Sequence, residues 1–290
     1  MASPRVSVLI PVRSPGPGIR DVLAAIFQQQ APFEFEVRIV DSGSSTEELA
    51  IMREFPLVLA QIPPREFGHG RTRNLLAKDA AGEVLVFLVQ DAQPVGKEWL
   101  ATLVTALAEP AVGGAFSRQL PWPDASPLMR FFLQETYPPT PARKRTGATE
   151  ALTFADMFFS NVGSAMRRTV WQQLPFREDV VMSEDQYWAA AALRAGYELV
   201  YQPAACLYHS HNYSLLSLFR RNALSGASLR GLIADTPGGV AGRGLDYLRR
   251  EAAYLLGSGK AGWLPYMMLY EAVRTAGFGW GFRFGRGRIP

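Results

Sequence analysis

The segment Val84-Leu-Val-Phe-Leu-Val-Gln-Asp91 constrains the fold of this chain more than any other stretch. A continuous run of aliphatic, β-branched and aromatic residues is typical of a strand buried on both faces, and such strands belong to parallel sheets covered by helices. Asp91 follows at the carboxyl end of the strand, before Pro94 ends the pairing. Open α/β sheets bind ligands at this edge, but an Asp here also makes turns and helix caps. Asp91 is therefore predicted to be either a binding-site acid or a turn residue.

Three earlier runs have the same strand-like composition, at Val6–Val12, Phe35–Val40 and Leu57–Ile62. Apolar residues recur at helical spacing between these runs. Asp41 follows the second run just as Asp91 follows the fourth. Strands that alternate with helices predict an α/β fold with a doubly wound, mainly parallel sheet.

The middle of the chain is less regular. A helix is predicted at Lys97–Glu109 and a strand at Gly113–Arg118. From Leu120 to Thr149 the periodicity fails, while prolines and basic residues accumulate. A connection of this length in a compact domain predicts a functional loop or a partly mobile lid. Order is expected to resume over Phe158–Arg167.

Ser183-Glu-Asp-Gln186 is typical of a helix start, with Ser183 as the N-cap and Gln186 as the reciprocal residue of a capping box. The predicted helix ends at Gly196. The remaining expected elements are two strands, Tyr197–Tyr201 and Ala204–His209, and three helices, at 215–233, 244–256 and 263–276.

Composition places the chain among globular proteins, because 48% of its 290 residues are apolar. The single cysteine, Cys206, excludes an intramolecular disulfide, which fits a reducing compartment. The sequence passes from Met1 almost directly into the first predicted strand, which leaves no room for the apolar region of a signal peptide. We therefore expect a cytoplasmic protein.

The net charge of +4 is unevenly distributed, because basic residues gather after residue 219. They are Arg220, Arg221, Arg230, Arg243, Arg249, Arg250, Lys260, Arg274, Arg283, Arg286 and Arg288. A basic end favours an anionic partner, such as a membrane surface or a phosphorylated substrate, although it also fits a solvated surface. Nucleic acid is not expected, because no recognised binding module accompanies the basic residues.

The most apolar late stretch, Trp263 to Phe282, contains Glu271 and Arg274 and so falls short of a membrane span. It is still suited to lying on a membrane surface.

The assembled order resembles that of family 2 glycosyltransferases, which have the GT-A fold, over roughly residues 5–212. The segments that carry this resemblance are Val8–Val12, Val40–Ser44, Arg73-Asn74, Ala81–Glu83, Leu88–Ala92 and Ser183–Gln186. Three motifs look like those of the bacterial rhamnosyltransferase branch: Phe67–Asn74, Gln90–Ala92 and His209–Ser214. The resemblance implies a GT-A domain over 1–212, with a mixed, mainly parallel sheet flanked by helices. Residues 213–290 would form a C-terminal helical, Arg-rich appendage.

The chain departs from the Asp-x-Asp motif of the family, since Val89 occupies the position of the first acid and Asp91 that of the second. The resemblance therefore implies a metal site with a lone motif carboxylate. We expect Asp91 to hold Mg²⁺ or Mn²⁺ together with the donor's phosphates and a histidine. His209 and His211 are two residues apart, so an extended segment would point both the same way. We slightly favour His209, and an ordinary polar strand end is the alternative.

The resemblance also implies where a nucleotide-sugar donor binds. The backbone after Pro11 and the side chain of Asp41 would hold the base and ribose, although Asp41 also suits a cap for the following helix. A flexible, cationic turn would approach the phosphates with guanidinium groups and backbone amides. His69 lies in this turn, as a phosphate contact or as an exposed loop residue. The predicted donor-binding residues are Pro11, Val12, Arg13, Asp41, Gly70, Arg71, Arg73, Gln90 and Asp91.

Asp185 is the predicted catalytic base, with Glu184 in a supporting role. Asp185 would take the proton of the acceptor hydroxyl as that oxygen attacks the anomeric carbon opposite the diphosphate, in one displacement with inversion. The alternative is that both acids only start a helix, where acids are favoured by about 0.3–1 kcal/mol. Asn161, Trp122 and Trp188 are expected to bind the acceptor, the tryptophans as stacking platforms, unless they are simply core residues.

These expectations describe an inverting, metal-dependent transferase. It would move a sugar, expected to be L-rhamnose from dTDP-rhamnose, to a saccharide or lipid-linked acceptor in surface polysaccharide synthesis. Two alternatives remain open: the same fold with a UDP-sugar donor (GlcNAc or galactose), and a nucleotide-sugar-binding protein without turnover. The basic helical end would place a cytoplasmic protein peripherally at an anionic membrane.

Overall fold

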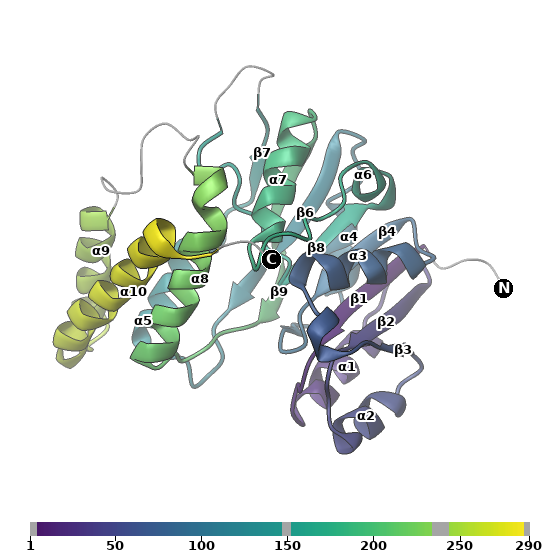
Figure 1. The fold of residues 1–290 in the computed structure, drawn as a ribbon, viewed down its shortest axis with the longest axis horizontal. Helices are drawn as coiled ribbons and strands as arrows, with labels where there is room; N and C mark the ends of the chain where they lie inside the picture. The colour runs from purple at the N-terminus through teal and green to yellow at the C-terminus, as the bar shows by residue number, and fades with distance from the viewer. Residues whose placement is uncertain (1–4, 147–151, 234–243, 287–290) are drawn as a thin grey trace.

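The structure, a computed structural model, describes residues 5–146, 152–233 and 244–286. Its centre is a mixed sheet in which the strands follow the order β3-β2-β1-β4-β8-β6-β9-β5, with β7 paired to β9 (Figure 1). Strands β1 to β4 are parallel to one another, and β8 runs antiparallel to its neighbours β4 and β6. The predicted mixed, mainly parallel α/β fold is confirmed.

The first half of the sheet is built from alternating strands and helices. Its elements are β1 (Val6–Val12), α1 (Ile19–Phe27), β2 (Phe35–Asp41), α2 (Thr46–Arg53), β3 (Val58–Gln61), η1 (Pro64–Glu66), α3 (His69–Asp79) and β4 (Val84–Leu88). All five residues of β4 are buried, and their side chains alternate between two hydrophobic clusters on opposite faces of the sheet. Leu85 and Phe87 belong to one cluster, and Val84, Val86 and Leu88 belong to the other. The strand is therefore buried on both faces, as its sequence predicts.

The second half supplies the strands that make the sheet mixed. Its elements are β5 (Gln93–Pro94), α4 (Trp99–Thr105), β6 (Val112–Leu120), α5 (Pro127–Thr136), β7 (Ala142–Lys144), β8 (Gly163–Arg167), α6 (Arg168–Gln173), α7 (Glu184–Arg194) and β9 (Glu198–Tyr208). Strand β9 is one strand rather than the predicted two. A register shift in its pairing with β6, between Ser117 and Arg118, absorbs the irregularity around Pro203.

The expected long loop at Leu120–Thr149 is largely ordered, which corrects that prediction, although 147–149 lie outside the described residues. Helix α5 begins at Pro127, and the hydroxyl of Ser126 caps it by accepting a hydrogen bond from the Met129 amide at 3.2 Å. Leu128 and Leu133 are buried. A Ser-Pro helix start followed by an apolar face was a readable signal, but the surrounding prolines obscured it.

The start of helix α7 is as predicted, but its capping box is absent. Ser183 has a left-handed backbone (φ 66°, ψ 23°), and its side chain makes no capping hydrogen bond. The amides of Gln186 and Tyr187 instead reach the Ser183 carbonyl, at 3.1 and 3.2 Å. A non-glycine residue in this region is held there by its surroundings, and such strain gathers at functional sites.

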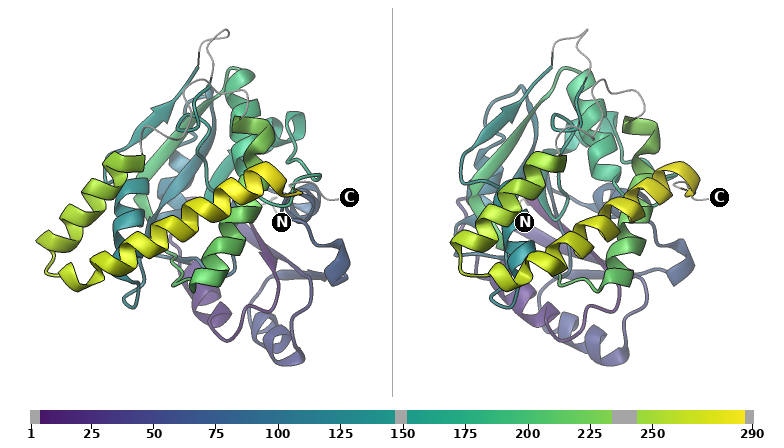
Figure 2. Two further views of the ribbon diagram at one scale, coloured as in Figure 1. Left: turned by 60° about the vertical axis from the view of Figure 1, so that its left-hand side comes forward. Right: turned by 90° about the vertical axis from the view of Figure 1, so that its left-hand side faces the viewer.

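Three helices complete the described chain: α8 (Leu215–Ile233), α9 (Gly244–Gly257) and α10 (Leu264–Phe284), with the short η3 (Ala261–Trp263) before the last. Helix α10 runs eight residues beyond the predicted end. Figure 2 shows α10 lying across α8 with α9 beside it. Leu128 of α5 packs with Leu255 and Met267 of these helices, so the helical end is joined to the first 212 residues through a shared apolar cluster. No helix in the described ranges has the length and apolar character needed to cross a membrane.

Candidate functional site

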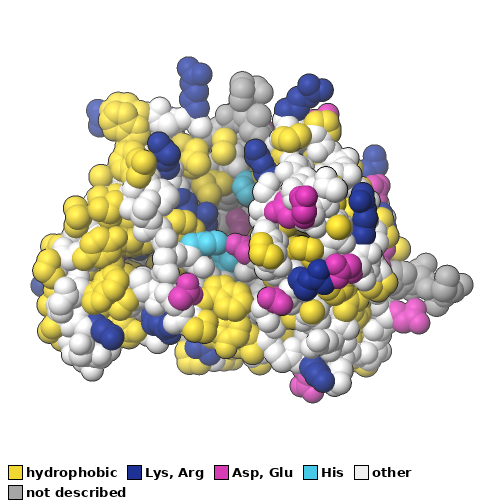
Figure 3. All heavy atoms as spheres, turned by 90° about the horizontal axis from the view of Figure 1, so that it is seen from below, with side chains coloured by type: hydrophobic (Ala, Val, Ile, Leu, Met, Phe, Trp, Pro, Cys, Tyr) yellow, Lys and Arg dark blue, Asp and Glu magenta, His cyan; other side chains and the backbone are white. Residues whose placement is uncertain are grey.

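A cavity of about 590 Å³ opens at the carboxyl ends of β1 and β4. Residues from both ends of the chain line it, from Pro11 after β1 to Arg274 on α10. In the space-filling view from below, histidine and acidic side chains lie together in a hollow near the middle of the molecule (Figure 3). Most of the predicted site residues reach this cavity.

Asp91, His209 and His211 form a cluster on the cavity wall. One ligand atom from each lies within 4.8 Å of the others. The Nε2 atom of His211 is 3.3 Å from Asp91 Oδ2 and 3.2 Å from His209 Nε2, and His209 Nε2 is 3.8 Å from Asp91 Oδ1. Both imidazoles thus turn the same nitrogen toward the carboxylate, which is the arrangement predicted for the pair.

Side chains along the segment that carries the histidines point alternately in two directions. His209 and His211 face Asp91, while Ser210 and Asn212 face the loop that precedes α5. The Ser210 hydroxyl accepts a hydrogen bond from the Trp122 amide at 3.0 Å. Asn212 accepts one from the Ser126 amide at 2.9 Å and donates one to the Asp124 carbonyl at 3.0 Å. The extended backbone therefore fixes the histidines by anchoring the residues between them.

Gln119 orients His209 from behind, and sequence reasoning missed it. Its amide nitrogen donates to the hydroxyls of Tyr137 and, at 3.0 Å, Ser160, so its oxygen faces Nδ1 of His209 at 2.9 Å. Nδ1 then carries the proton, and Nε2 presents its lone pair to the cluster. Burial lowers the pKa of His209 to about 4, despite the opposing attraction of Asp91. His209 is thus neutral at pH 7, which is the form that binds metal.

These donors fit a divalent cation. A carboxylate oxygen and two neutral imidazole nitrogens converge from one side, while Asp91 and His211 keep 44% and 39% of their side-chain surface exposed toward incoming ligands. The open side leaves positions for substrate oxygens. The cluster thus contains a second histidine in addition to Asp91, while Val89, at the position of the motif's first acid, also lines the cavity.

Two adjacent acids at the start of α7 have different surroundings. Glu184 is 4% exposed, and its Oε1 lies 3.0 Å from Nη1 of Arg73, with the Asn161 amide donating to it at 3.3 Å. Burial acts to raise the pKa of Glu184, but the charges of Arg73 and His69 outweigh it, and the pKa is lowered. Glu184 is therefore an ionised, structural partner of Arg73.

Asp185 lines the cavity and keeps a weakly acidic carboxyl. It accepts backbone hydrogen bonds from Asn161 at 3.1 Å and from Gln186 at 2.9 Å. Burial and the neighbouring charge of Glu184 together raise its pKa to about 7. A carboxyl with this pKa is poised to take a proton near neutral pH.

The ends of β1 and β4 are tied together beside Asp91. The side chain of Gln90 accepts a hydrogen bond from the Arg13 amide at 2.7 Å and donates one to the Arg13 carbonyl at 3.2 Å. Pro11, Arg13 and Gln90 line the cavity, whereas Val12 is buried in the core. Three of the predicted donor-binding residues thus lie next to Asp91 on the cavity wall.

Asp41 lies apart from the cavity wall. It is 1% exposed, and its carboxylate accepts hydrogen bonds from the amide and hydroxyl of Ser44, at 3.1 and 2.5 Å, and from Gln61 at 3.3 Å. The cap of helix α2 is Ser45, which forms a capping box with Glu48. Asp41 therefore shapes its own loop instead of capping the helix, and its role toward a donor stays a prediction.

The expected flexible, cationic turn is the first turn of helix α3, which corrects the prediction. A Cβ at Gly70 would come within 1.9 Å of the Arg177 carbonyl, so the glycine is needed for close packing. Arg71 is half exposed and 3.7 Å from Glu178, outside the cavity lining. His69 and Arg73 do line the cavity, and His69 lies against Arg73 rather than in an open loop.

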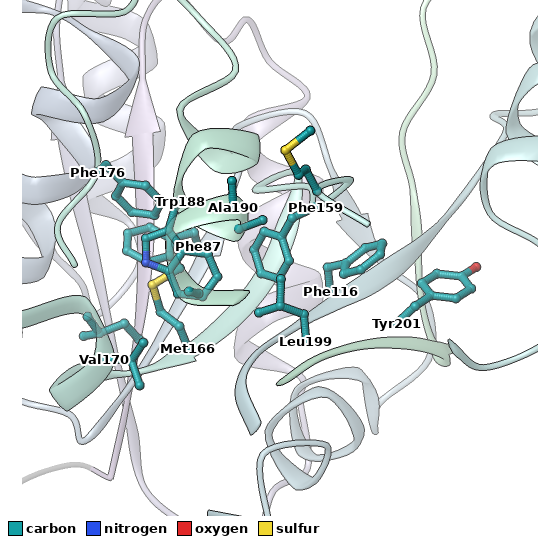
Figure 4. Close-up of a cluster of buried hydrophobic side chains, with 14 of the residues drawn as sticks. Phe87, Phe116, Phe159, Met166, Val170, Phe176, Trp188, Ala190, Leu199 and Tyr201 are labelled. Atoms are coloured by element: carbon teal, nitrogen blue, oxygen red, sulfur yellow. The ribbon is translucent and has the colours of Figure 1, made fainter. Parts of the chain in front are cut away.

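The predicted acceptor residues separate in the structure. Trp188 is 2% exposed within the aromatic core (Figure 4), so it offers no face to a sugar and the prediction was wrong. Trp122 stacks on Tyr208 at 5.0 Å between ring centroids and lies outside the cavity lining. Asn161 lines the cavity, but its amide is engaged with Glu184 and Ser164.

A second groove, of about 640 Å³, adjoins the cavity and was not foreseen. Tyr213 and Tyr270 line both hollows, and the groove adds the rings of Trp263 and Tyr266. The cavity itself extends to Glu271 and Arg274 of α10, whose side chains are 2.5 Å apart. Two charges inside an otherwise apolar stretch were the sequence signal for this wall.

Comparison with known proteins agrees with this geometry. The model of glycosyl transferase family 2 matches residues 7–174, so the chain belongs to glycosyltransferase family 2. The O-antigen chain rhamnosyltransferase RfbN of Salmonella typhimurium is 30% identical over 279 residues, which cover 94% of this chain and 88% of that protein. WbaN of Salmonella anatum, also an O-antigen chain rhamnosyltransferase, is 29% identical over 95% of this chain and 88% of its own length. The predicted resemblance to bacterial rhamnosyltransferases is confirmed.

Solved structures share the fold. The mannosyltransferase PcManGT from Pyrobaculum calidifontis, in complex with GDP-Man and Mn²⁺, superposes with a TM-score of 0.66 at 22% identity and covers 97% of this chain and 88% of its own. S. aureus TarS 1-349 in complex with UDP-GlcNAc gives a TM-score of 0.55 at 16% identity, covering 96% and 90%. The predicted GT-A fold is therefore confirmed.

Proposed function

We propose that this glycosyltransferase is an inverting rhamnosyltransferase that moves L-rhamnose from dTDP-rhamnose to a saccharide or lipid-linked acceptor during surface polysaccharide synthesis. The observation that carries the proposal is that the Asp91–His209–His211 cluster and the carboxyl of Asp185 open into one cavity. The two O-antigen rhamnosyltransferase relatives, which match along most of the chain, support the choice of sugar.

The donor would lie along the ends of β1 and β4, with its diphosphate toward Asp91, His209 and His211. A bound divalent cation supplies Lewis-acid stabilisation of the departing diphosphate. Because two of the three protein donors are imidazoles, we expect Mn²⁺ to bind more tightly than Mg²⁺, which prefers an all-oxygen shell. Gln119 holds His209 in the tautomer that this site requires.

Asp185 would act as the general base. In its ionised form it takes the proton of the acceptor hydroxyl, whose oxygen then attacks the anomeric carbon from the face opposite the diphosphate, giving inversion. The backbone amide of Asn161 donates to Asp185, and its side-chain amide donates to Glu184, which is paired with Arg73. These contacts would hold Asp185 in position. Arg73 is thereby assigned to the acid pair rather than to the phosphates.

The acceptor would enter from the groove that joins the cavity at Tyr213 and Tyr270. Aromatic faces bind the apolar faces of sugar rings, so Trp263 and Tyr266 replace the expected Trp122 and Trp188 as the proposed acceptor platform. A lipid-linked acceptor places the enzyme peripherally at the inner face of an anionic membrane.

Nucleotide release tests the proposal. The purified chain with Mn²⁺ is offered dTDP-rhamnose, UDP-GlcNAc and UDP-galactose in turn, and free nucleoside diphosphate is quantified. We expect turnover with dTDP-rhamnose above the other two, and NMR of the product should give an inverted anomeric configuration. Preference for a UDP-sugar would show that the proposed donor is wrong. Nucleotide binding without turnover of any donor would show that the chain is a binding protein rather than an enzyme.

A further inference from the structure

The solvent-exposed face of helix α10 is almost entirely apolar. Its exposed positions recur at helical spacing from Pro265 to Phe284. Met268, Trp280 and Phe284 are 57%, 58% and 61% exposed, and only Arg283 in this set is charged. The other two charged residues of α10, Glu271 and Arg274, pair with each other toward the cavity.

The inner face of α10 packs through small residues. A Cβ at Gly281 would lie 1.8 Å from the Ala223 carbonyl of α8, and one at Gly277 would lie 2.6 Å from the Phe219 carbonyl. Backbones that touch through glycines four residues apart, with large apolar side chains turned outward, are the pattern of helix pairs in lipid. A helix packed on a water-soluble core has the reverse pattern.

The charges around this face favour an anionic surface. After Glu251 the sequence contains one acid, Glu271, which Arg274 already neutralises. Lys260, Arg283 and Arg286 are exposed near the two ends of α10. Hydrophobic side chains gather over the side of the molecule that the C-terminal helices form (Figure 3), and α10 lies at the surface along its length (Figure 2).

We propose that the exposed face of α10, defined by Met268, Leu269, Trp280 and Phe284, inserts into the interfacial region of an anionic bilayer and lies parallel to it. A helix with an apolar face and basic ends binds there through buried apolar surface and attraction to anionic lipids. The proposal rests on the membrane location of the proposed function and names the surface responsible. Because the opposite face of α10 lines the cavity, docking holds the cavity about one helix diameter, ~10 Å, from the bilayer.

Flotation of the full chain with vesicles tests this surface. The probe is vesicles of 70% phosphatidylcholine and 30% phosphatidylglycerol, and the variant is Met268→Ser/Leu269→Ser/Trp280→Ser/Phe284→Ser. We expect the wild type to float and the variant to lose about tenfold or more in partition coefficient. High salt should release the wild type only in part, because apolar insertion is not screened. The matched control is Val58→Ser/Phe154→Ser, which removes exposed apolar side chains elsewhere and should float like the wild type.

Two further readouts separate folding and catalysis from docking. Hydrolysis of dTDP-rhamnose in vesicle-free buffer should be equal in the wild type and the fourfold variant, because none of the four residues lines the cavity. Brominated lipids should quench fluorescence in the wild type, and the quenched part should disappear in Trp280→Phe, which keeps an apolar ring. Flotation with no turnover would reject the proposed function alone. Equal flotation of wild type and variant, or a wild type that stays unbound and self-associates through α10, would overturn the docking surface.

Discussion

Arg73 and Glu184 form an ion pair at 3.0 Å in which the side chains are only 4% and 5% exposed. This pair determines how the two neighbouring acids divide their roles. Arg73 keeps Glu184 ionised. Burial, together with the fixed negative charge of Glu184, raises the pKa of Asp185 to about 7. Two adjacent carboxyls with separated pKa values are a common basis for assigning a base and its support.

Asp185→Asn should lower kcat about 10²–10⁴-fold, because the amide cannot accept the acceptor's proton. Binding of dTDP, measured by calorimetry in the presence of Mn²⁺, should stay within about twofold of wild type, since Asp185 is not placed among the donor-binding residues. Asp156→Asn, at a loop acid hydrogen-bonded to Thr153 and outside the cavity lining, is the matched control. Turnover that survives in Asp185→Asn would remove Asp185 as the base.

The pH profile should follow the raised pKa of Asp185. The base works when ionised, so kcat/KM should fall about tenfold per unit as pH drops below about 7, and level off above it.

Between the ordinary Asp value of 3.8 and about 7, the folded state holds a proton that the unfolded state has lost. The contribution of this carboxyl to stability therefore decreases as pH rises through that window. Urea titrations at pH 5 and pH 8, on the wild type and Asp185→Asn, measure the difference; equal pH dependence in both would contradict it.

Arg73→Met should cost about 3–5 kcal/mol in the free energy of unfolding, because it leaves the Glu184 carboxylate buried without its partner. Arg73→Met/Glu184→Met should recover part of that loss, since no unpaired charge remains. Urea unfolding followed by circular dichroism measures both. A double variant no more stable than the single one would show that the loss comes from packing.

His211→Ala should weaken Mn²⁺ binding, measured by paramagnetic resonance titration in the presence of dTDP, because only Asp91 and His209 remain. Val89→Asp should raise the affinity for Mg²⁺, because it adds a second hard oxygen ligand beside Asp91. Unchanged Mn²⁺ affinity in His211→Ala, with Asp91→Asn also unchanged, would exclude this cluster as the metal site.

Gln119→Leu should reduce Mn²⁺ affinity about 10–100-fold without removing a ligand, because His209 loses the acceptor that fixes its tautomer. Gln119→Glu keeps an acceptor at that position and should lose less. An equal loss in the two variants would point to altered packing around Tyr137 rather than to orientation of His209.

The chain's own patterns predicted the parallel half of the fold because its two central strands, Val6–Val12 and Val84–Leu88, are continuous buried runs. Helix α5 escaped prediction because its short apolar face follows the signal at Ser126 and Pro127 among prolines that indicate a loop. Asp91, His209, His211 and Asp185 were predictable because the family motifs carry them. Gln119 was not, because its contact with His209 joins residues that are far apart in sequence and have no motif. Glu271 and Arg274 stood out as charges in an apolar stretch, but the sequence did not indicate that they face the cavity.

In the extended segment from His209 to Asn212, alternate side chains face Asp91 and the loop before α5. Successive side chains of an extended segment point in opposite directions, so a shift of one residue exchanges the two sets. A single-residue insertion after Tyr208 would exchange them, sending serine and asparagine toward Asp91 and the imidazoles toward the loop. The length of this segment should therefore be far less tolerant of change than residue identity at Ser210 or Asn212.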